Sequence, residues 1–464
     1  MNRFRENLPS VLVATLSAAF GVALLSITGV LAQAIRSDDR TGGSATVAVM
    51  LSIVAIVFLS IAVYVGAVVT ANTFATIIAG RRRTIALLRL IGSSAASERR
   101  RVARSGLVVG IVGAVLGTVI GVAISAVLST IGVAQGFLPR VAYEFMEPVL
   151  LLPIIAVVLT TWLASWVGSR RVLTVSPMEA TGAAVESTMD EVDARRARSA
   201  VALTFVILGV ALLIFGVLLG LAHPGGVLVG LVGGLVSFTG VVLGAHRVMP
   251  LALRLTGRLF GRSAPARLAA ENAVRYPERS SRTTVGLVIG VTLITMFAVA
   301  TESYRVIIRS AQQAQPELYQ GVDELLNSTL TIFSVLIGFS AVIAAVGMVN
   351  NLSLSILQRT RELGLLRALG FTGGQVRAMV LVESAQLTIA SLLVGLVLGT
   401  VYGWAGAQSL FGSINGAPGL VLPAVPLGLI GVLVAASALL IAISSIAPAR
   451  RATRVSPVAA LAVD

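Results

Sequence analysis

Long uncharged apolar runs, separated by short segments that carry the charges, dominate this chain. A helix needs about 20 mostly apolar residues to cross a bilayer. Eight runs are long enough for one crossing each, and they lie at about 11–31, 46–71, 106–131, 148–168, 283–301, 328–351, 378–403 and 422–446.

The uncharged stretch between Arg198 and Arg247 differs from the others because it is too long for a single crossing. His223-Pro224-Gly225-Gly226 at its centre is a helix-breaking sequence, so we predict two spans here. Numbered along the chain, these two are spans five and six, and the four runs that follow them are spans seven to ten. The pattern therefore predicts an all-α polytopic membrane protein with about ten transmembrane helices. An even number of spans places both termini on the same side of the membrane.

The charges are unevenly divided between the two sides of this predicted topology. Only 12% of the residues are charged, and the 35 cations, all of them arginine, outnumber the 20 acids. Arginine-rich loops stay in the cytoplasm, so we predict that both the N- and the C-terminus are cytoplasmic. The segments then assigned to the outer side carry few arginines and many acids: Arg36, Arg40, Arg140, Arg305 and Arg309 against Asp38, Asp39, Glu144, Glu147, Glu302, Glu317, Asp323 and Glu324.

Two sequence matches indicate an internal duplication. The block Arg361–Gly370 (RELGLLRALG) has an earlier, degenerate copy at Arg83–Gly92 (RTIALLRLIG). Further on, Arg450–Pro457 matches Arg170–Pro177 at almost the same separation along the chain. Two matches at nearly the same separation predict two repeats of one structural unit.

We predict that each repeat holds four spans and that the remaining two spans are inserted between the repeats. Both units then have the same orientation, and their symmetry axis runs along the membrane normal. The expected divisions are a first unit at 1–182, a linker with the inserted pair at 183–247, a cytoplasmic amphipathic segment at 248–282, and a second unit at 283–464.

The cytoplasmic segment is predicted to contain a helix that lies on the inner leaflet. Its apolar and arginine residues alternate at helical spacing, a pattern typical of surface-bound helices. The residues are Leu251, Leu255, Leu259 and Phe260, with Arg254, Arg258 and Arg262.

The repeated block is predicted to face the cytoplasm in both units. On a helix, Leu363, Leu366 and Leu369 form an apolar stripe, and the closing glycine is a typical helix stop. A positive cytoplasmic loop would explain the arginines but not the repeated Leu-Leu-Arg pattern. A short amphipathic helix at the membrane rim is suited to a groove of a partner protein.

No set of residues in the chain points to catalysis or to a bound metal or cofactor. His223 and His246 lie at opposite ends of one predicted span, so we interpret them as loop or interface residues. There is no cysteine, and no lysine to reach the phosphates as a phosphate-binding loop requires. We expect that the chain is not an enzyme and that any ATP site belongs to another subunit. Because topology accounts for the basic charge, no nucleic-acid partner is expected.

Asn350, the block at 361–370 and the terminal segment Pro448–Pro457 together resemble the FtsX-like permease domain of the MacB, LolC and BceB superfamily of ABC-transporter membrane subunits. Leu268–Arg275 resembles the lead-in to such domains. The second unit resembles the family across about 180 residues. The first resembles it more loosely, with Thr84 where the family has glutamate. The short outer loops leave no room for the large extracytoplasmic domain of many members.

This resemblance implies a multi-pass subunit of the bacterial plasma membrane that carries two copies of an ABC ATPase, with ATP and Mg bound by that partner and no cofactor in this chain. The two blocks would be the coupling helices that contact the ATPases, and the weaker match of the first implies a weaker contact. The coupling residues so implied are Arg361, Glu362, Leu363, Gly364, Leu366, Arg367 and Gly370, with Arg83, Leu87, Leu88, Arg89 and Gly92 in the first copy.

Three functions stay open at this point. The first is export or extraction of an amphipathic or lipid-like substrate, peptide or drug that enters from the surrounding lipid. The second is mechanical signalling without a substrate to a sensor kinase or cell-wall hydrolase, with an extracytoplasmic accessory protein as a further candidate partner. The third is an ATP-independent secondary carrier. It is disfavoured because no predicted span has an ionisable residue near its middle, and Glu383 lies only about one turn into its span.

Overall fold

In the computed structural model the chain is helical, and no strand occurs among the residues that it describes. These residues are 2–36, 45–80, 93–134, 136, 138–145, 147–169, 196–258, 268, 271, 277–317, 369–428, 430–439 and 441. The principal elements are α1 (Asn2–Arg36), α2 (Ala45–Gly80), α4 (Ala95–Ala134), η1 (Pro148–Leu150), α5 (Leu151–Gly168), α8 (Arg196–Gly220), α9 (Gly226–Leu243), α10 (Ala245–Gly257), α12 (Pro277–Ala314) and α15 (Gly373–Phe411).

Eight helices in the described ranges are long and apolar enough to cross a membrane. They coincide with the predicted spans one to seven and nine, and the break between spans five and six falls in the turn between α8 and α9, as predicted. A shorter apolar helix, Ile430–Leu439, falls within the predicted tenth span. The predicted eighth span at 328–351 lies outside the described residues.

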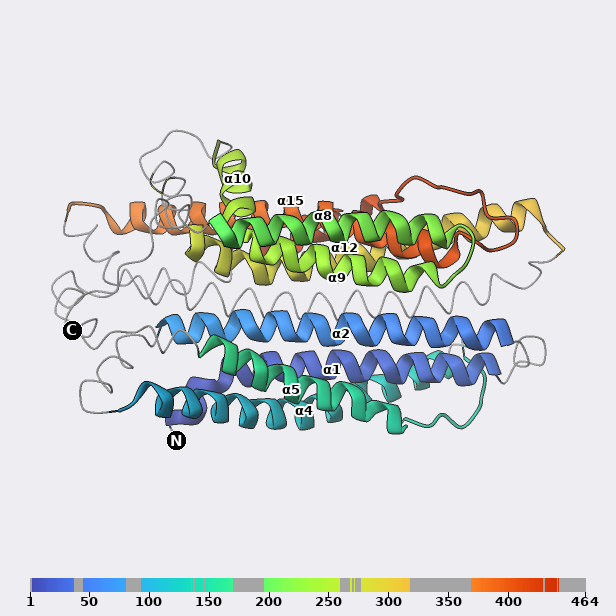
Figure 1. Ribbon diagram of the computed structural model, residues 1–464, viewed down its shortest axis with the longest axis horizontal. Coiled ribbons are helices and arrows are strands. Elements are labelled where there is room, and N and C mark those ends of the chain that lie inside the picture. Colours follow the sequence, from blue (N-terminus) through green and yellow to red (C-terminus); the bar gives the residue numbers. More distant parts are fainter. Residues whose placement is uncertain are drawn as a thin grey trace.

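The long helices run side by side as a bundle, which Figure 1 shows in two groups. One group contains α1, α2, α4 and α5, and the other contains α8, α9, α12 and α15. Corresponding helices of the two repeats run in the same direction: α1 with α12, and α4 with α15 (Figure 1). This agrees with the parallel repeats predicted from the sequence.

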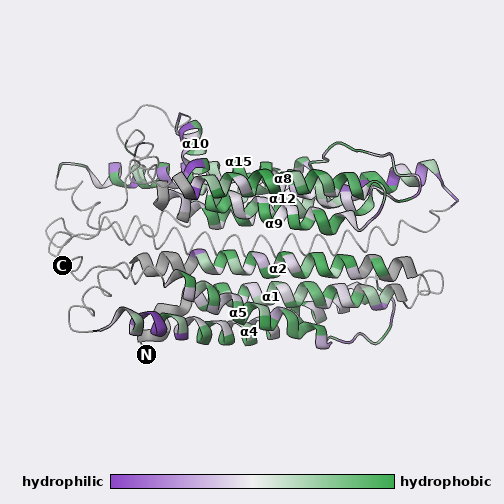
Figure 2. Cartoon of the chain, in the orientation of Figure 1, coloured by the Kyte–Doolittle hydropathy of each residue, from purple (hydrophilic) through white to green (hydrophobic). Residues whose placement is uncertain are grey.

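Apolar residues make up most of the long helices, as the colours of Figure 2 show, and many of them are exposed on the outside of the bundle. Large exposed hydrophobic residues recur along the outer faces of α4, α5 and α8, where a water-soluble protein would place polar ones. Such surfaces are suited to contact with lipid. Examples are Val115, Val119, Leu159, Leu203 and Ile207.

Several helices are much longer than the spans predicted for them. The longest are α4 with 40 residues, α15 with 39 and α12 with 38, which is about 60 Å at 1.5 Å per residue, or roughly twice the thickness of the hydrocarbon core. The predicted third span began at 106, after the charged Arg99–Arg104, but α4 already includes those arginines. Charged side chains end a span because lipid excludes them, yet they do not end a helix in water.

The first and third helices of each repeat pack closely through glycines of the third helix. The sequence GxVLGTVxG occurs at 113–121 in α4 and again at 395–403 in α15. A Cβ atom added at Gly117 would lie 2.5 Å from the backbone oxygen of Thr15 in α1. A Cβ atom at Gly399 would lie 2.5 Å from the Cβ of Thr295 in α12. Small residues allow this close approach of helices in lipid, where the hydrophobic effect does not drive helices together.

The inserted pair, α8 and α9, packs mainly against the second repeat. The two helices contact each other through glycines, and the end of α8 reaches α15, where a Cβ at Gly220 would meet the backbone of Ser409. α9 also contacts α2 of the first repeat. The inserted pair therefore lies between the repeats and touches both.

Candidate functional site

The predicted coupling block lies almost wholly outside the described residues. Of the implied residues, Gly370 is described, and the others lie in the ranges 81–92 and 318–368, which the structure does not describe. Their role in coupling therefore stays a prediction. The residues that follow each block are described, and they establish how each block is connected to the bundle.

A tight turn joins the second block to α15. Gly370 has φ +99°, in the left-handed region that glycine adopts without steric cost, and Leu369 before it is 73% exposed. Thr372 and Gln375 form a capping box: the Thr372 hydroxyl accepts from Gln375 N at 3.2 Å, and Thr372 N donates to the Gln375 side chain at 2.9 Å. Phe371 packs against a buried cluster near the start of α15. The turn is thus held in place, and α15 begins directly after it.

The first block is followed by an equivalent helix start. Ser97 N donates to the Ser94 hydroxyl at 3.1 Å, at the beginning of α4. Ser94 and Ser97 correspond to Thr372 and Gln375 when the two blocks are aligned. Glu98, which is buried, accepts from the Ser93 hydroxyl at 2.9 Å. A serine or threonine at the N-cap position is a sequence signal that could have located both helix starts, and Gln375 completes a capping box at the second.

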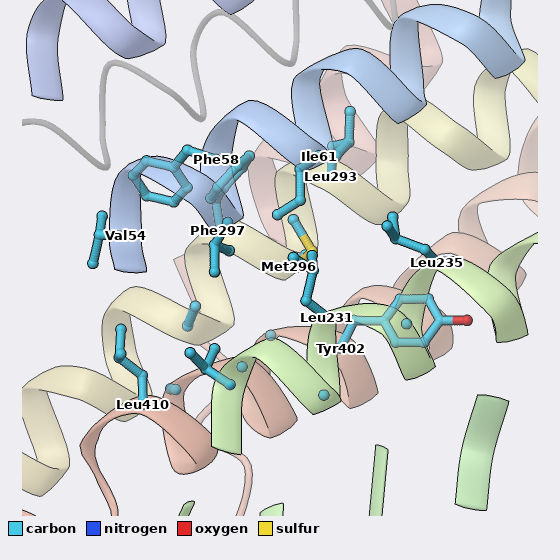
Figure 3. A pocket seen from close by; sticks show the side chains of 18 of the residues that line it. Val54, Phe58, Ile61, Leu231, Leu235, Leu293, Met296, Phe297, Tyr402 and Leu410 are labelled. Atoms are coloured by element: carbon cyan, nitrogen blue, oxygen red, sulfur yellow. The ribbon is translucent and has the colours of Figure 1, made fainter. Parts of the chain in front are cut away.

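The far part of α15 lines an apolar cavity of about 410 Å³. Residues of α2, α9, α12 and α15 make up most of its wall, and none of the described residues that line it is charged. Ten of them are labelled in Figure 3: Val54, Phe58, Ile61, Leu231, Leu235, Leu293, Met296, Phe297, Tyr402 and Leu410.

The cavity extends toward the end of the bundle opposite the starts of α4 and α15. Tyr304 and Ile308 of α12 line it near the end of that helix, as does Phe411, the last residue of α15. With the topology predicted from the arginines, this end faces the outer leaflet. The volume lies within the range of about 300–1,000 Å³ that is typical of small-molecule sites.

Aromatic side chains connect the two repeats beside this cavity. The ring of Phe238 in α9 makes edge contacts with Tyr64 of α2 and with Tyr402 of α15, each at a centroid distance of 6.2 Å. The hydroxyl of Tyr64 shares a hydrogen bond with Thr239 at 2.8 Å, and that of Tyr402 shares one with Ser237 at 3.0 Å. Because partners on α9 engage both hydroxyls, the tyrosines present mainly their rings to the cavity.

The two histidines lie at opposite ends of α9, as predicted. His223 accepts a hydrogen bond from Gly225 N at 2.9 Å in the turn before the helix. His246, beyond the other end, is buried and contacts the Ser199 hydroxyl at 3.3 Å. In the described part of the chain no three His, Asp or Glu side chains lie close enough together to hold a metal ion.

The family FtsX-like permease C-terminal matches the chain twice, at residues 56–177 and 334–457. The number of residues that separates the two matches is almost the same as the number that separates the two blocks. It is also almost the same as the number that separates Arg170–Pro177 from Arg450–Pro457. The duplication found within the sequence is therefore confirmed. Together the two matches cover more than half of the chain.

Known relatives match over shorter stretches. The uncharacterized ABC transporter permease YknZ of Bacillus subtilis is 34% identical over 145 residues, which are 31% of this chain and 34% of YknZ. The macrolide export ATP-binding/permease protein MacB of Nitrobacter winogradskyi is 29% identical over 149 residues, which are 31% of this chain and 21% of MacB. The ABC transporter permease YtrF of Bacillus subtilis is 30% identical over 59 residues, 13% of this chain and 14% of YtrF. The matches thus span no more than about a third of these relatives.

The apolar helices and the twofold family match agree on what kind of protein this is. Each match covers the block and the apolar segments that follow it in one repeat. The chain therefore belongs to the FtsX-like permease family and is a multi-pass protein of the bacterial plasma membrane.

Proposed function

We propose that this chain is the membrane subunit of an ATP-binding-cassette transporter that exports or extracts an amphipathic or lipid-like substrate, peptide or drug. The observation that carries the proposal is the continuity of α15. This helix begins at the turn after the second coupling block and ends at the wall of the apolar cavity. A movement of the block would therefore reach the cavity through one helix.

The ATPase is assigned to a separate partner. The relatives YknZ and YtrF are named ABC transporter permeases, and this chain has no lysine for a phosphate-binding loop. Two blocks in one chain suit two ATPase copies, which would bind ATP and Mg themselves. In this proposal the chain itself is not an enzyme.

The cavity supports a substrate with a large apolar part. Its wall is aliphatic and aromatic, and it lies in the half of the bundle that the arginine distribution places toward the outer leaflet. Because the predicted outer loops are short, we expect the substrate to enter from the lipid rather than from a soluble binding domain.

Purification of the chain from its native membrane tests the first part of this function. We expect an ATPase subunit to co-purify with the chain in a ratio of two to one, and the complex to hydrolyse ATP. If the chain emerges alone, and no co-purifying fraction hydrolyses ATP, the ABC proposal is wrong and a secondary carrier becomes the better hypothesis.

Gly406→Phe is expected to block transport by filling the cavity. Gly406 lines the cavity, and a Cβ atom placed there meets no other atom within 4 Å, so the ring can enter the open space. We expect basal ATP hydrolysis to persist while extraction of a fluorescent lipopeptide from reconstituted vesicles falls by about tenfold or more, about 1.4 kcal/mol of barrier or greater.

Gly431→Phe is the matched control for this variant, because that site is also open but is exposed outside the cavity. It should transport like the unmodified protein. Unimpaired extraction by Gly406→Phe would show that the substrate does not use this cavity. ATP hydrolysis without extraction of any apolar cargo would favour the signalling function.

A further inference from the structure

α10 follows α9 directly and leaves the direction of the spans. α9 ends at Leu243, one residue, Gly244, forms the turn, and α10 begins at Ala245. Figure 1 shows α10 crossing the direction of α8 and α9, near the end of the bundle where α15 begins. A helix that crosses the spans at the end of one of them lies along the membrane surface. By the predicted topology this is the inner surface.

One face of α10 is packed against the second repeat. Its residues Met249 and Leu253 are buried in the main apolar core with residues of α12 and α15. The Ser281 hydroxyl of α12 donates to the backbone oxygen of Ala245 at 2.9 Å. The side chain of Gln386 in α15 donates to the backbone oxygen of Leu253 at 2.8 Å. α10 is therefore fixed at its start to α12 and near its end to α15.

The opposite face of α10 is exposed and is divided into two stripes. At about 100° per residue, Arg247, Arg254 and Arg258 lie within about 40° of one another around the helix axis, and all three are exposed. Leu251 and Leu255 follow on one side of them, with exposures of 62% and 58%. In a helix at a bilayer surface, the leucines would face the acyl chains and the arginines the headgroups.

The contact with Gln386 connects this surface to the proposed coupling path. Gln386 is fully buried, and its donor is held by Leu253 at the inner side of α10. It belongs to the same helix that starts directly after the second coupling block. A shift of the base of α15 must therefore either move α10 or break this hydrogen bond.

We propose that α10 binds anionic phospholipid headgroups of the inner leaflet, and that this binding sets the position of α15 through Gln386, so that headgroup charge regulates the transport cycle. The arginine stripe attracts the anionic headgroups, and the leucine stripe inserts among the acyl chains. The regulatory half rests on the proposed function, whereas the lipid contact does not.

Lipid binding is measured on the chain alone, with phosphatidylglycerol as the probe and phosphatidylcholine as the neutral reference. Arg254→Gln with Arg258→Gln should weaken phosphatidylglycerol affinity about fivefold for each arginine removed. Arg309→Gln is the matched control, because Arg309 is exposed near the opposite end of α12. Equal affinity of the double variant and the unmodified chain would overturn the lipid site.

Regulation is measured on the complete complex with its ATPase, in nanodiscs with and without phosphatidylglycerol. The unmodified complex should change its ATPase rate with phosphatidylglycerol. Gln386→Leu should keep the lipid affinity and lose the response, and Gln386→Met gives the same readout if the leucine variant does not insert. A full response in a Gln386 variant that binds lipid normally would overturn the link to α15. Absence of any ATPase would count against the proposed function, while the binding measurement would still decide the lipid site.

Discussion

Leu366→Asp is expected to separate the permease from its ATPase while leaving the chain in the membrane. Leu366 is in the apolar stripe of the second block, which we propose seats in a groove of the partner. An aspartate there would have to lose its hydration in an apolar contact. Central apolar anchors of interfaces typically contribute about 2 kcal/mol or more, so ATPase affinity should fall by about 30-fold or more. The measurement is co-purification followed by an ATPase assay.

Leu88→Asp is the matched change in the first block, and its effect is expected to be smaller. The first copy has Thr84 where the second has Glu362, so the first contact should contribute less to ATPase binding. Glu362→Arg should act in the same direction as Leu366→Asp, because it reverses a charge within the stronger block. Equal losses from the two leucine changes would contradict the proposed asymmetry, and no loss from either would show that the blocks do not contact the ATPase.

The main architecture could be predicted from the sequence because lipid imposes simple rules. Backbone groups in a bilayer must be paired within a helix, so uncharged length alone locates the spans. The break at His223–Gly226 was equally predictable, since Pro224 and glycines interrupt a run that is too long for one crossing. The duplication is visible in the sequence for a different reason. Both repeats retain the arginine-containing block and the segment at Arg450–Pro457, and the two pairs of copies have nearly the same separation along the chain.

The lengths and contacts of the helices could not be predicted in the same way. Charge marks where lipid ends, and it does not mark where a helix ends, so the part of α4 before residue 106 was missed. The shared GxVLGTVxG sequence is present in both copies, but the sequence alone does not identify it as a packing surface. The two copies of this motif are separated by slightly more residues than the two blocks are. The repeats therefore differ in the number of residues between the block and the motif.

The cavity and the role of α10 required three-dimensional information. Most of the cavity wall comes from four helices that are separate in the sequence, and each wall residue alone resembles an ordinary core position. The amphipathic pattern of the segment after α9 was predicted, and Leu251 and Leu255 are indeed exposed on a helix. The contact from Gln386 to Leu253 was not predicted, because nothing in the sequence pairs two positions 133 residues apart.

Gly399→Ala and Gly406→Ala are expected to change stability in opposite directions, although both add one methyl group to α15. A Cβ at Gly399 would lie 2.5 Å from the Cβ of Thr295 and 2.7 Å from the backbone oxygen of Thr292. Both positions are on α12, so the two helices must move apart, at a cost of about 1–3 kcal/mol. At Gly406 the methyl group meets nothing within 4 Å, and alanine stabilises a helix by up to about 1 kcal/mol relative to glycine.

The free energy of unfolding in mixed micelles distinguishes these outcomes, because both variants can be compared with the unmodified chain under one condition. Gly117→Ala in α4 should behave like Gly399→Ala, since it would bring a methyl group against the backbone of α1 in the same way. If Gly399→Ala were as stable as Gly406→Ala, α12 and α15 would not be in close contact. The effect of Gly117→Ala would then decide whether the close packing belongs to one repeat or to neither. A loss at both positions is the result expected of a duplicated unit whose third helix is held against its first by small residues.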